Sequence, residues 1–262
     1  MRAPGAILRP ARLVLRSVAP FLVALPVLWI AQGASPPDVS IVLVAIAVNV
    51  ILAVSLNVVN GFTGQFSIGH AAFMAVGAYT AALVTTGMQD LQISGLPLGA
   101  SDAVVFFLAL AAGMVAAAAA GLLVGIPSLR LRGDYLAIVT LGFGEIIRIF
   151  LNNLNAPINL TNGPQGIGRI DPVSVASVPL NITQNIFGIA LPSVHLYFYL
   201  FLACTALVIL VSQRLERSRI GRAWMAIRED EIAAGAMGIN TRNMKLLAFA
   251  MGAMFGGASG AL

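Results

Sequence analysis

The chain has 262 residues, of which 59% are hydrophobic and only 10% are charged, and its formal net charge is +5. Ordinary soluble domains carry about 25% charged residues, so the composition excludes that class and predicts a polytopic membrane protein. The basic residues form only short clusters beside apolar segments, which excludes an extended nucleic-acid-binding face.

Seven apolar windows come close to the length of about 20 residues that a transmembrane helix needs. They cover residues 13–31, 39–59, 66–87, 103–126, 135–151, 195–212 and 246–262. The predicted fold is all-α, a single polytopic transmembrane helix bundle over residues 1–262 with about seven spans. Its two long connections are residues 152–194 and residues 214–245.

The distribution of charge predicts the orientation of these spans. If the N-terminus is cytoplasmic, thirteen of the fifteen basic residues lie on cytoplasmic segments: Arg2, Arg9, Arg12, Arg16, Arg130, Arg132, Arg214, Arg217, Arg219, Arg222, Arg228, Arg242 and Lys245. The external segments then hold Asp38, Asp90, Asp102, Asp171 and the cation Arg169. This positive-inside pattern predicts an irregular external loop over residues 152–194 and a cytoplasmic loop over residues 214–245.

The first window has two interpretations. It is a retained span, or it is a cleaved signal peptide, because arginines stand at its start and the small-residue pattern Ala31-Gln32-Gly33-Ala34 stands at its end. Pro20 and Pro26 interrupt its apolar part, which suits a retained span at least as well.

Polar and small residues interrupt the apolar pattern near residues 60–66, where a broken helix is expected. Non-helical backbone at membrane depth needs burial in protein or a watery cavity. The interruption is therefore either a tight turn at the membrane surface or a broken helix beside a translocation path. The candidate path residues are Asn60, Gly61, Thr63, Gly64, Gln65, Ser67 and His70.

The span predicted over residues 135–151 carries two opposite charges, Glu145 and Arg148. Their spacing of three places them on one helical face, where they can form an intramembrane ion pair. A charge at mid-membrane costs on the order of 3 kcal/mol, so the pair is expected to face the bundle or lie near an interface. A structural role near the outer end of the span is favoured over contact with a substrate.

Residues 214–245 hold seven of the fifteen basic residues and four of the ten acidic ones. Within them, Asp230 is expected to cap a short helix over residues 231–237 by accepting a hydrogen bond from an amide near Ala233, and Gly238 to end it in the left-handed conformation. The small residues of this helix suit entry into a partner's cleft. Its flanks equally suit a position on the lipid headgroups, anchored by Trp224 and neighbouring arginines.

Recognisable catalytic chemistry is absent from the sequence. The only lysine, Lys245, is not part of a phosphate-binding loop, and neither Gly-x-Ser-x-Gly nor His-Glu-x-x-His occurs. His70 and His195 are too far apart to indicate a metal site, and the single Cys204 excludes an internal disulfide. The chain is predicted to be no enzyme and to hold no cofactor or metal.

The last window contains Gly252, Gly256 and Gly260, whose four-residue spacing predicts close helix packing. Four further blocks lie in order along the chain: residues 60–72, residues 129–145, residues 161–167, and residues 221–240 with Gly221-Arg-Ala-Trp224 and Glu231-Ile-Ala-Ala-Gly-Ala-Met-Gly-Ile-Asn240. Together these blocks resemble the LivM-type permease subunit of branched-chain amino-acid ABC importers.

The resemblance implies a subunit of an ATP-driven importer for branched-chain or related hydrophobic amino acids in the bacterial inner membrane. It implies as partners a second, LivH-like permease, two cytoplasmic ATPase subunits that bind ATP and Mg, a periplasmic substrate-binding protein, and membrane lipid. It assigns coupling with an ATPase to Asp230, Glu231, Ile232, Ala233, Ala234 and Gly238.

The chain departs from the family pattern in three places. Ile232 separates Glu231 from the alanine pair, and Gly235 replaces a residue that is often larger in relatives. Relatives also continue through further spans after the position of Leu262, so a truncated product or a partial sequence is expected.

In the predicted mechanism, partner ATPases close on ATP and displace the helix over residues 231–237, which rearranges the spans around residues 60–70. Two rival interpretations are a passive channel and a membrane-embedded enzyme acting on lipid. A channel needs no docking helix, and an enzyme should present ionisable groups at one membrane depth.

Overall fold

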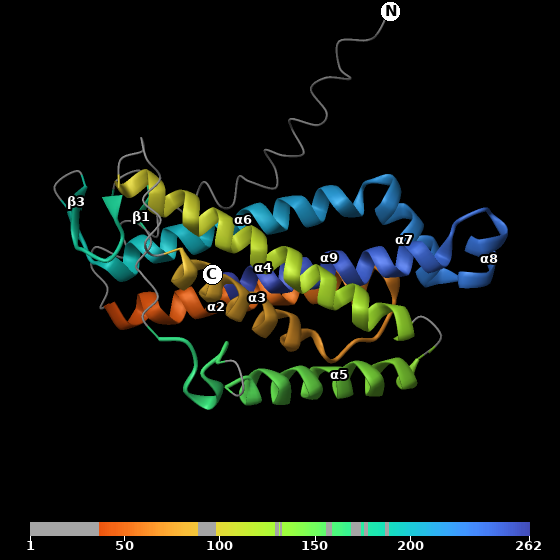
Figure 1. Ribbon diagram of the computed structural model, residues 1–262. Coiled ribbons are helices and arrows are strands. Elements are labelled where there is room, and N and C mark those ends of the chain that lie inside the picture. Colours follow the sequence, from red (N-terminus) through yellow and green to blue (C-terminus); the bar gives the residue numbers. More distant parts are fainter. Residues whose placement is uncertain are drawn as a thin grey trace, which may run out of the picture.

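The chain is largely helical in the computed structural model, which describes residues 37–88, 98–128, 131, 133–155, 159–168, 174–175, 178–186 and 189–262 (Figure 1). The α-helices are α2 (Pro37–Asn57), α3 (His70–Gly87), α4 (Leu98–Ser128), α5 (Asp134–Asn153), α6 (Ser193–Glu216), α7 (Arg219–Glu229), α8 (Glu231–Ala236) and α9 (Thr241–Ala261). The window over residues 13–31 lies outside the described residues, as do the small-residue pattern after it and Asp90, Arg130, Arg132, Arg169 and Asp171.

Four of the described helices are long and apolar enough to cross a membrane, namely α2 with its continuation, α4, α6 and α9. The windows predicted over residues 66–87 and 135–151 fall on α3 and α5, which have 18 and 20 residues. The prediction of an all-α bundle is confirmed, and the chain is a multi-pass membrane protein. The predicted number of about seven spans is matched only roughly.

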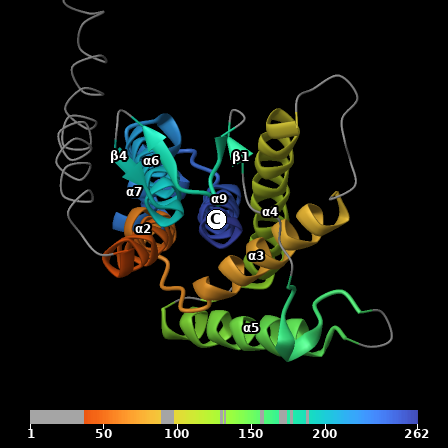
Figure 2. The same cartoon turned by 90° about the vertical axis from the view of Figure 1, so that its left-hand side faces the viewer.

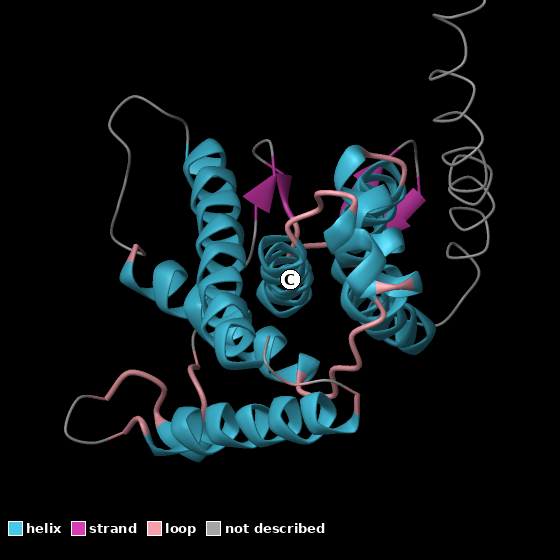
Figure 3. Cartoon of the chain, turned by 90° about the vertical axis from the view of Figure 1, so that its right-hand side faces the viewer, coloured by secondary structure: helices cyan, strands magenta, loops and turns pink. Residues whose placement is uncertain are grey.

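Helix α9 lies at the centre of the bundle. Figures 2 and 3 show it nearly end-on, between α2 and α6 on one side and α3 and α4 on the other. Ile51, Val208 and Trp224 belong to an apolar cluster on the first side, and Phe73 and Ala253 to a cluster on the second. Since α9 is also the most buried of the four candidate spans, the other helices pack around it.

Glycines allow this close approach, as the sequence predicts. A Cβ added to Gly252 would lie 2.5 Å from Val59 Cγ2, and one added to Gly260 would overlap the Met74 carbonyl oxygen of α3. Gly257, which is not part of the predicted spacing, is equally confined, because a Cβ added there would overlap Ala117 Cβ of α4. The close packing of α9 is therefore confirmed.

The interruption between α2 and α3 begins later than predicted. After Asn57 the helix widens into a π-helical turn, η2 (Val58–Phe62), and helical backbone continues to Thr63. Such a turn accommodates an additional residue without ending the helix, so Asn60 and Gly61 do not break it. The break starts at Gly64, which has a left-handed φ of +67°.

The segment after Gly64 reverses the chain direction between α2 and α3 (Figure 1). Thr63, Gln65, Ser67 and His70 are nevertheless buried. The interruption is thus a turn enclosed by protein, and a translocation path beside it stays a prediction.

The connection over residues 152–194 is more regular than predicted. It contains a 3₁₀ turn, η3 (Gly163–Gln165), and two antiparallel hairpins, β1 (Ser174–Val175) with β2 (Val178–Pro179) and β3 (Gln184–Ile186) with β4 (Ile189–Leu191). Strands this short carry little sequence signal, although pairing satisfies their backbone groups. Figure 1 places β1 and β3 at the end of the bundle opposite α7 and α8, so the two long connections lie at opposite ends, as predicted.

Candidate functional site

The predicted short helix is present as α8, and local hydrogen bonds fix both of its ends. Asp230 Oδ1 accepts from the amides of Ile232 at 2.7 Å and Ala233 at 3.1 Å. Gly238 follows with a left-handed φ of +84°, and the amide of Ile239 donates to the Ala234 carbonyl at 3.1 Å. The predicted cap and glycine stop are confirmed, and the helix ends one residue earlier than expected.

Helix α8 projects from the end of the bundle (Figure 1). It presents apolar side chains to its surroundings. Ile232 is 76% exposed and Met237, just after the helix, is 84% exposed, whereas Ala234 faces the protein. Large exposed apolar side chains on a well-capped helix are typical of an interaction surface.

Trp224 does not anchor this region in lipid, so that part of the lipid interpretation is wrong. Its side chain is fully buried, and its ring stacks on Phe62 with centroids 6.5 Å apart. Its Nε1 donates to the Met244 carbonyl at 2.8 Å. Burial of the ring satisfies both the apolar surface and the N–H of the indole, and joins α7 to η2 and α9.

An ion pair joins α8 to α9. Lys245 Nζ lies 2.6 Å from Glu231 Oε1, and the side chains are 10% and 29% exposed. A lysine ammonium this well buried requires a nearby counter-charge. Movement of helix α8 away from α9 would therefore leave the buried charge of Lys245 without a counter-charge.

Arg228 of α7 connects this region to the interruption between α2 and α3. Its Nη1 donates to the Gly61 carbonyl at 2.8 Å. Its aliphatic stem lies against Gly64, where an added Cβ would come within 2.9 Å of Arg228 Cγ. Gly64 is thus required both by its φ and by the approach of the arginine.

A cavity of about 220 Å³ lies between the two sets of predicted residues. Glu231 lines it from α8, and Thr63, Gly64 and Gln65 line it from the interruption. The structure therefore brings part of the predicted coupling set and part of the predicted path set to one site.

Hydrogen bonds hold the interruption in place, but they leave some of its polar atoms without partners. The amide of Ser67 donates to Asn60 Oδ1 at 3.1 Å, and the amide of Ile68 donates to Thr140 Oγ1 of α5 at 3.1 Å. Within the described part of the chain, Gln65 Oε1 and Ser67 Oγ are buried without a hydrogen-bond partner. Unpartnered buried polar atoms are unusual and often mark functional positions.

His70 begins α3 and links three helices. The Ser55 hydroxyl donates to the Leu52 carbonyl at 2.9 Å, so the imidazole Nε2–H is the donor in the 2.5 Å contact with Ser55 Oγ. Gly252 and Gly256 of α9 lie against the ring. His70 is a hydrogen-bonded helix residue, as expected. Among the described residues no three His, Cys, Asp or Glu side chains gather as metal ligands would.

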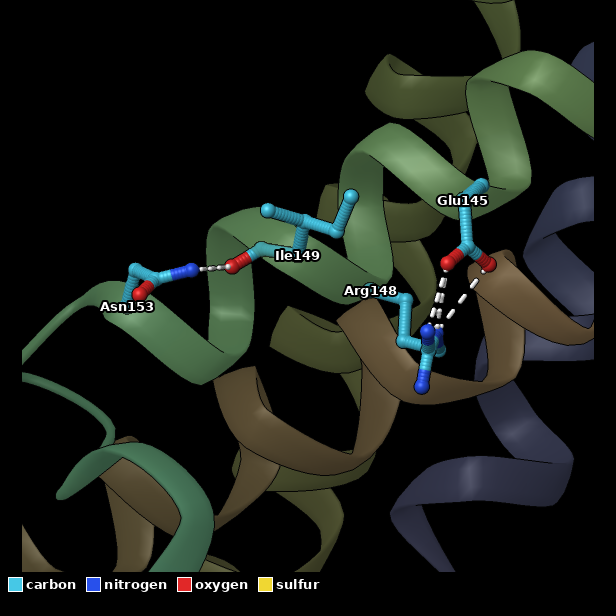
Figure 4. A network of polar contacts seen from close by, with 4 residues as sticks. All are labelled: Glu145, Arg148, Ile149 and Asn153. Atoms are coloured by element: carbon cyan, nitrogen blue, oxygen red, sulfur yellow. Dashed lines mark hydrogen bonds and ion pairs between the residues drawn. The ribbon is translucent and has the colours of Figure 1, made fainter.

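Glu145 and Arg148 form the predicted ion pair on α5 (Figure 4). Arg148 Nη2 lies 2.5 Å from Glu145 Oε1, and Arg148 Nε donates to both carboxylate oxygens at 3.1 and 3.0 Å. The side chains of Arg148 and Glu145 are 68% and 52% exposed, so the alternative that they face the bundle is wrong. The alternative that they lie near a membrane interface stays a prediction. Spacing predicts the pairing, but it does not predict which face of α5 packs on α3.

The roles of Arg228, Thr140 and Lys245 are not predicted by the sequence patterns. Lys245 had a readable signal, because a lone lysine in the second turn of an apolar helix requires a counter-charge. The contacts of Arg228 and Thr140 join segments far apart in the chain and leave no local pattern.

Known proteins that are similar to this chain are also transport permeases. The profile of a family described as branched-chain amino acid transport system / permease component matches residues 39–262. The chain is similar to the high-affinity branched-chain amino acid transport system permease protein LivM of Escherichia coli (strain K12), with 41% identity over 258 residues, or 92% of this chain and 56% of the relative. No solved structure matches the chain.

The corresponding LivM protein of Salmonella typhimurium (strain LT2) is 40% identical over 225 residues, which is 81% of this chain and 49% of the relative. The chain thus spans about half the length of the curated relatives it matches. A family of permease components agrees with the prediction that the chain is not an enzyme. The chain belongs to the family of permease components of branched-chain amino acid transport systems.

Proposed function

We propose that this chain forms half of the translocation path of an ATP-driven importer for branched-chain or related hydrophobic amino acids. Its partners are a second, LivH-like permease, two cytoplasmic ATPase subunits that bind ATP and Mg, and a periplasmic substrate-binding protein. It lies among the lipids of the bacterial inner membrane with its N-terminus in the cytoplasm. The names of the similar permease proteins support this assignment.

The observation that carries the proposal is the construction of α8. The helix is exposed on the side of Ile232 and Met237, yet it is fixed at both ends and tied to α9 by the Glu231–Lys245 pair. A headgroup-bound helix needs no rigid connection to the bundle, whereas a helix that receives force from a partner does. This favours the docking interpretation over the lipid interpretation.

Two contacts supply a route from α8 into the bundle. Force on α8 reaches α9 through Glu231 and Lys245. Movement of the adjoining α7 reaches the interruption between α2 and α3 through the hydrogen bond from Arg228 to the Gly61 carbonyl. Closure of the ATPases would thereby shift α9 and the candidate path residues together, as alternating access requires.

The test is to purify the assembled transporter in mild detergent, reconstitute it, and measure uptake of labelled L-leucine with its binding protein. Retained ATPase subunits and uptake that depends on ATP are expected. Leucine flux that is independent of ATP, from a permease that retains no ATPase, would indicate a passive channel and contradict the proposal.

Gly238 offers a matched test of the coupling helix. Nothing lies within 4 Å of a Cβ at Gly238 or at Gly235, but only Gly238 has a left-handed φ. Gly238→Ala should cost about 1–2 kcal/mol of local strain and slow ATP-driven uptake by up to about tenfold while the ATPase subunits remain bound. Gly235→Ala, within the helix, should leave uptake near the wild-type rate. Equal uptake by the two variants would show that the C-terminal cap of α8 plays no part in coupling.

A further inference from the structure

The ion pair of Glu145 and Arg148 lies in the middle of a helix, and both side chains are exposed. Glu145 is the twelfth of the 20 residues of α5, about 17 Å along a helix about 30 Å long. The side chains of Glu145 and Arg148 are 52% and 68% exposed. They line a groove of about 340 Å³ between α3 and α5.

Contact between lipid tails and the two charged side chains of this groove is unfavourable. Charged side chains within a membrane normally face protein or water, because exposure to hydrocarbon is costly. The apolar side chains that surround the pair on α5, among them Ile138 and Ile146, are exposed as well. The pair, together with Asn152 one turn further along α5, is therefore a polar position on a largely apolar face, which favours contact with a polar molecule.

The groove is lined by two kinds of surface. Ile68, Ala72 and Ala75 of the α3 side and Leu141 of α5 supply an apolar wall. The ion pair supplies one carboxylate and one guanidinium, and Tyr79 and Asn152 add a phenol and an amide. Its volume falls in the range of small-molecule sites, which commonly combine an apolar lining with few polar groups.

We propose that this groove contacts the transported amino acid as a zwitterion. The inference rests on the proposed function and names the residues that meet the substrate. The ammonium and carboxylate of a free α-amino acid are separated by one carbon atom, so they can pair with Glu145 and Arg148 side by side. Charge-assisted hydrogen bonds of this kind, with bidentate geometry at the arginine, are strong and directional. The aliphatic side chain of the amino acid lies on the apolar wall.

A phosphatidylethanolamine headgroup shares this chemistry, since it also carries an ammonium beside an anion. The pair lies in the middle of α5, which falls on the span predicted over residues 135–151. On that prediction the pair lies away from the membrane surface, where headgroups are, so the amino acid is favoured. The two sources are separated experimentally by reconstituting the transporter in phosphatidylcholine vesicles with and without phosphatidylethanolamine.

The binding test uses thiol labelling in the assembled transporter. Cys204 is the only native cysteine of the chain, so Cys204→Ser with Ala71→Cys places one thiol at an exposed position of the groove. L-Leucine should slow its labelling by a maleimide. 3-Methylbutylamine and 4-methylpentanoate, which lack the carboxylate and the ammonium of leucine respectively, should not slow it at the same concentration.

A charge swap separates substrate contact from a structural role. The double variant Glu145→Arg/Arg148→Glu keeps an i, i+3 ion pair, so a structural role survives the swap. It reverses the order of the charges relative to the apolar wall, and should reduce leucine uptake and leucine protection about tenfold or more. Ile149→Gln places a polar group on the same helix without lining the groove, and should transport normally. Retained ATPase activity shows that each variant is assembled.

The outcomes decide between the accounts. Wild-type import that depends on ATP, combined with no leucine protection or with a fully active swapped variant, overturns this inference and leaves the proposed function standing. Protection by phosphatidylethanolamine in place of leucine overturns it too. Failure of ATP-driven import in the wild type refutes the proposed function itself.

Discussion

Lys245 and Arg228 show how single residues connect the exposed end of the protein to its buried turn. Lys245 is the only lysine in the chain, and the carboxylate 2.6 Å from it belongs to Glu231 of α8. Arg228 lines the same cavity and donates to the Gly61 carbonyl. Each is a long side chain that joins two elements through one ionic or charge-assisted contact, so each should respond strongly to the loss of its partner.

The Glu231–Lys245 pair can be tested by a double-mutant cycle. Glu231→Gln leaves the buried ammonium of Lys245 without its counter-charge and should cost about 1–3 kcal/mol, less than a fully buried pair because Glu231 is 29% exposed. Lys245→Met removes the stranded charge, so the double variant should be more stable than Glu231→Gln alone. Thermal unfolding in detergent measures all four proteins. Strictly additive effects would mean that the two residues do not interact.

For single residues, the sequence predicts contacts between positions close together in the chain, but it does not predict contacts between positions far apart in the chain. Asp230 and Gly238 act on amides and dihedrals within their own helix, and both were predicted. The ion pair of Glu145 and Arg148 was predicted for the same reason. Arg228 contacts a carbonyl 167 positions away, which no local pattern records.

Among the described helices, α9 relies most on glycines for close packing against its neighbours. Gly260 meets the Met74 carbonyl and Gly252 meets Val59, so backbone and side chains of neighbouring helices occupy the space of the missing Cβ atoms. Because a backbone atom cannot rotate away, an added methyl group must push α3 and α9 apart.

Gly260→Ala should therefore destabilise the protein by about 1–3 kcal/mol, the usual cost of overpacking. Gly142→Ala is the matched control, because nothing lies within 4 Å of a Cβ at that position of α5. The melting temperature of each variant in detergent gives the comparison. Indistinguishable melting temperatures would show that α9 can shift at no cost.

The presence of a helix was easier to predict than the residues at which that helix begins and ends. The long apolar windows became helices, but the π-helical turn at Val58–Phe62 kept the α2 helix going past Asn60 and Gly61. Propensity treats such residues as helix breakers, whereas burial against neighbouring helices determines the outcome here.

For the whole molecule, charge predicted that residues 152–194 and residues 214–245 lie at opposite ends of the bundle, and they do. The central position of α9 and the outward position of the Glu145–Arg148 pair could not be predicted. Helices of a membrane protein are apolar on most faces, so their pattern does not distinguish a face that meets protein from one that meets lipid.

The central claim is that α8 receives an ATPase subunit at the cytoplasmic end of a permease. The most direct measurement is cross-linking from a single cysteine in the Cys204→Ser background of the assembled transporter, at Ile232→Cys on α8 or at Ile182→Cys near the opposite end, both at exposed positions. The account predicts cross-links from Ile232→Cys to an ATPase subunit and none from Ile182→Cys. An Ile232→Cys thiol that cross-links to no ATPase subunit, but reacts with a headgroup-attached lipid probe, would contradict it.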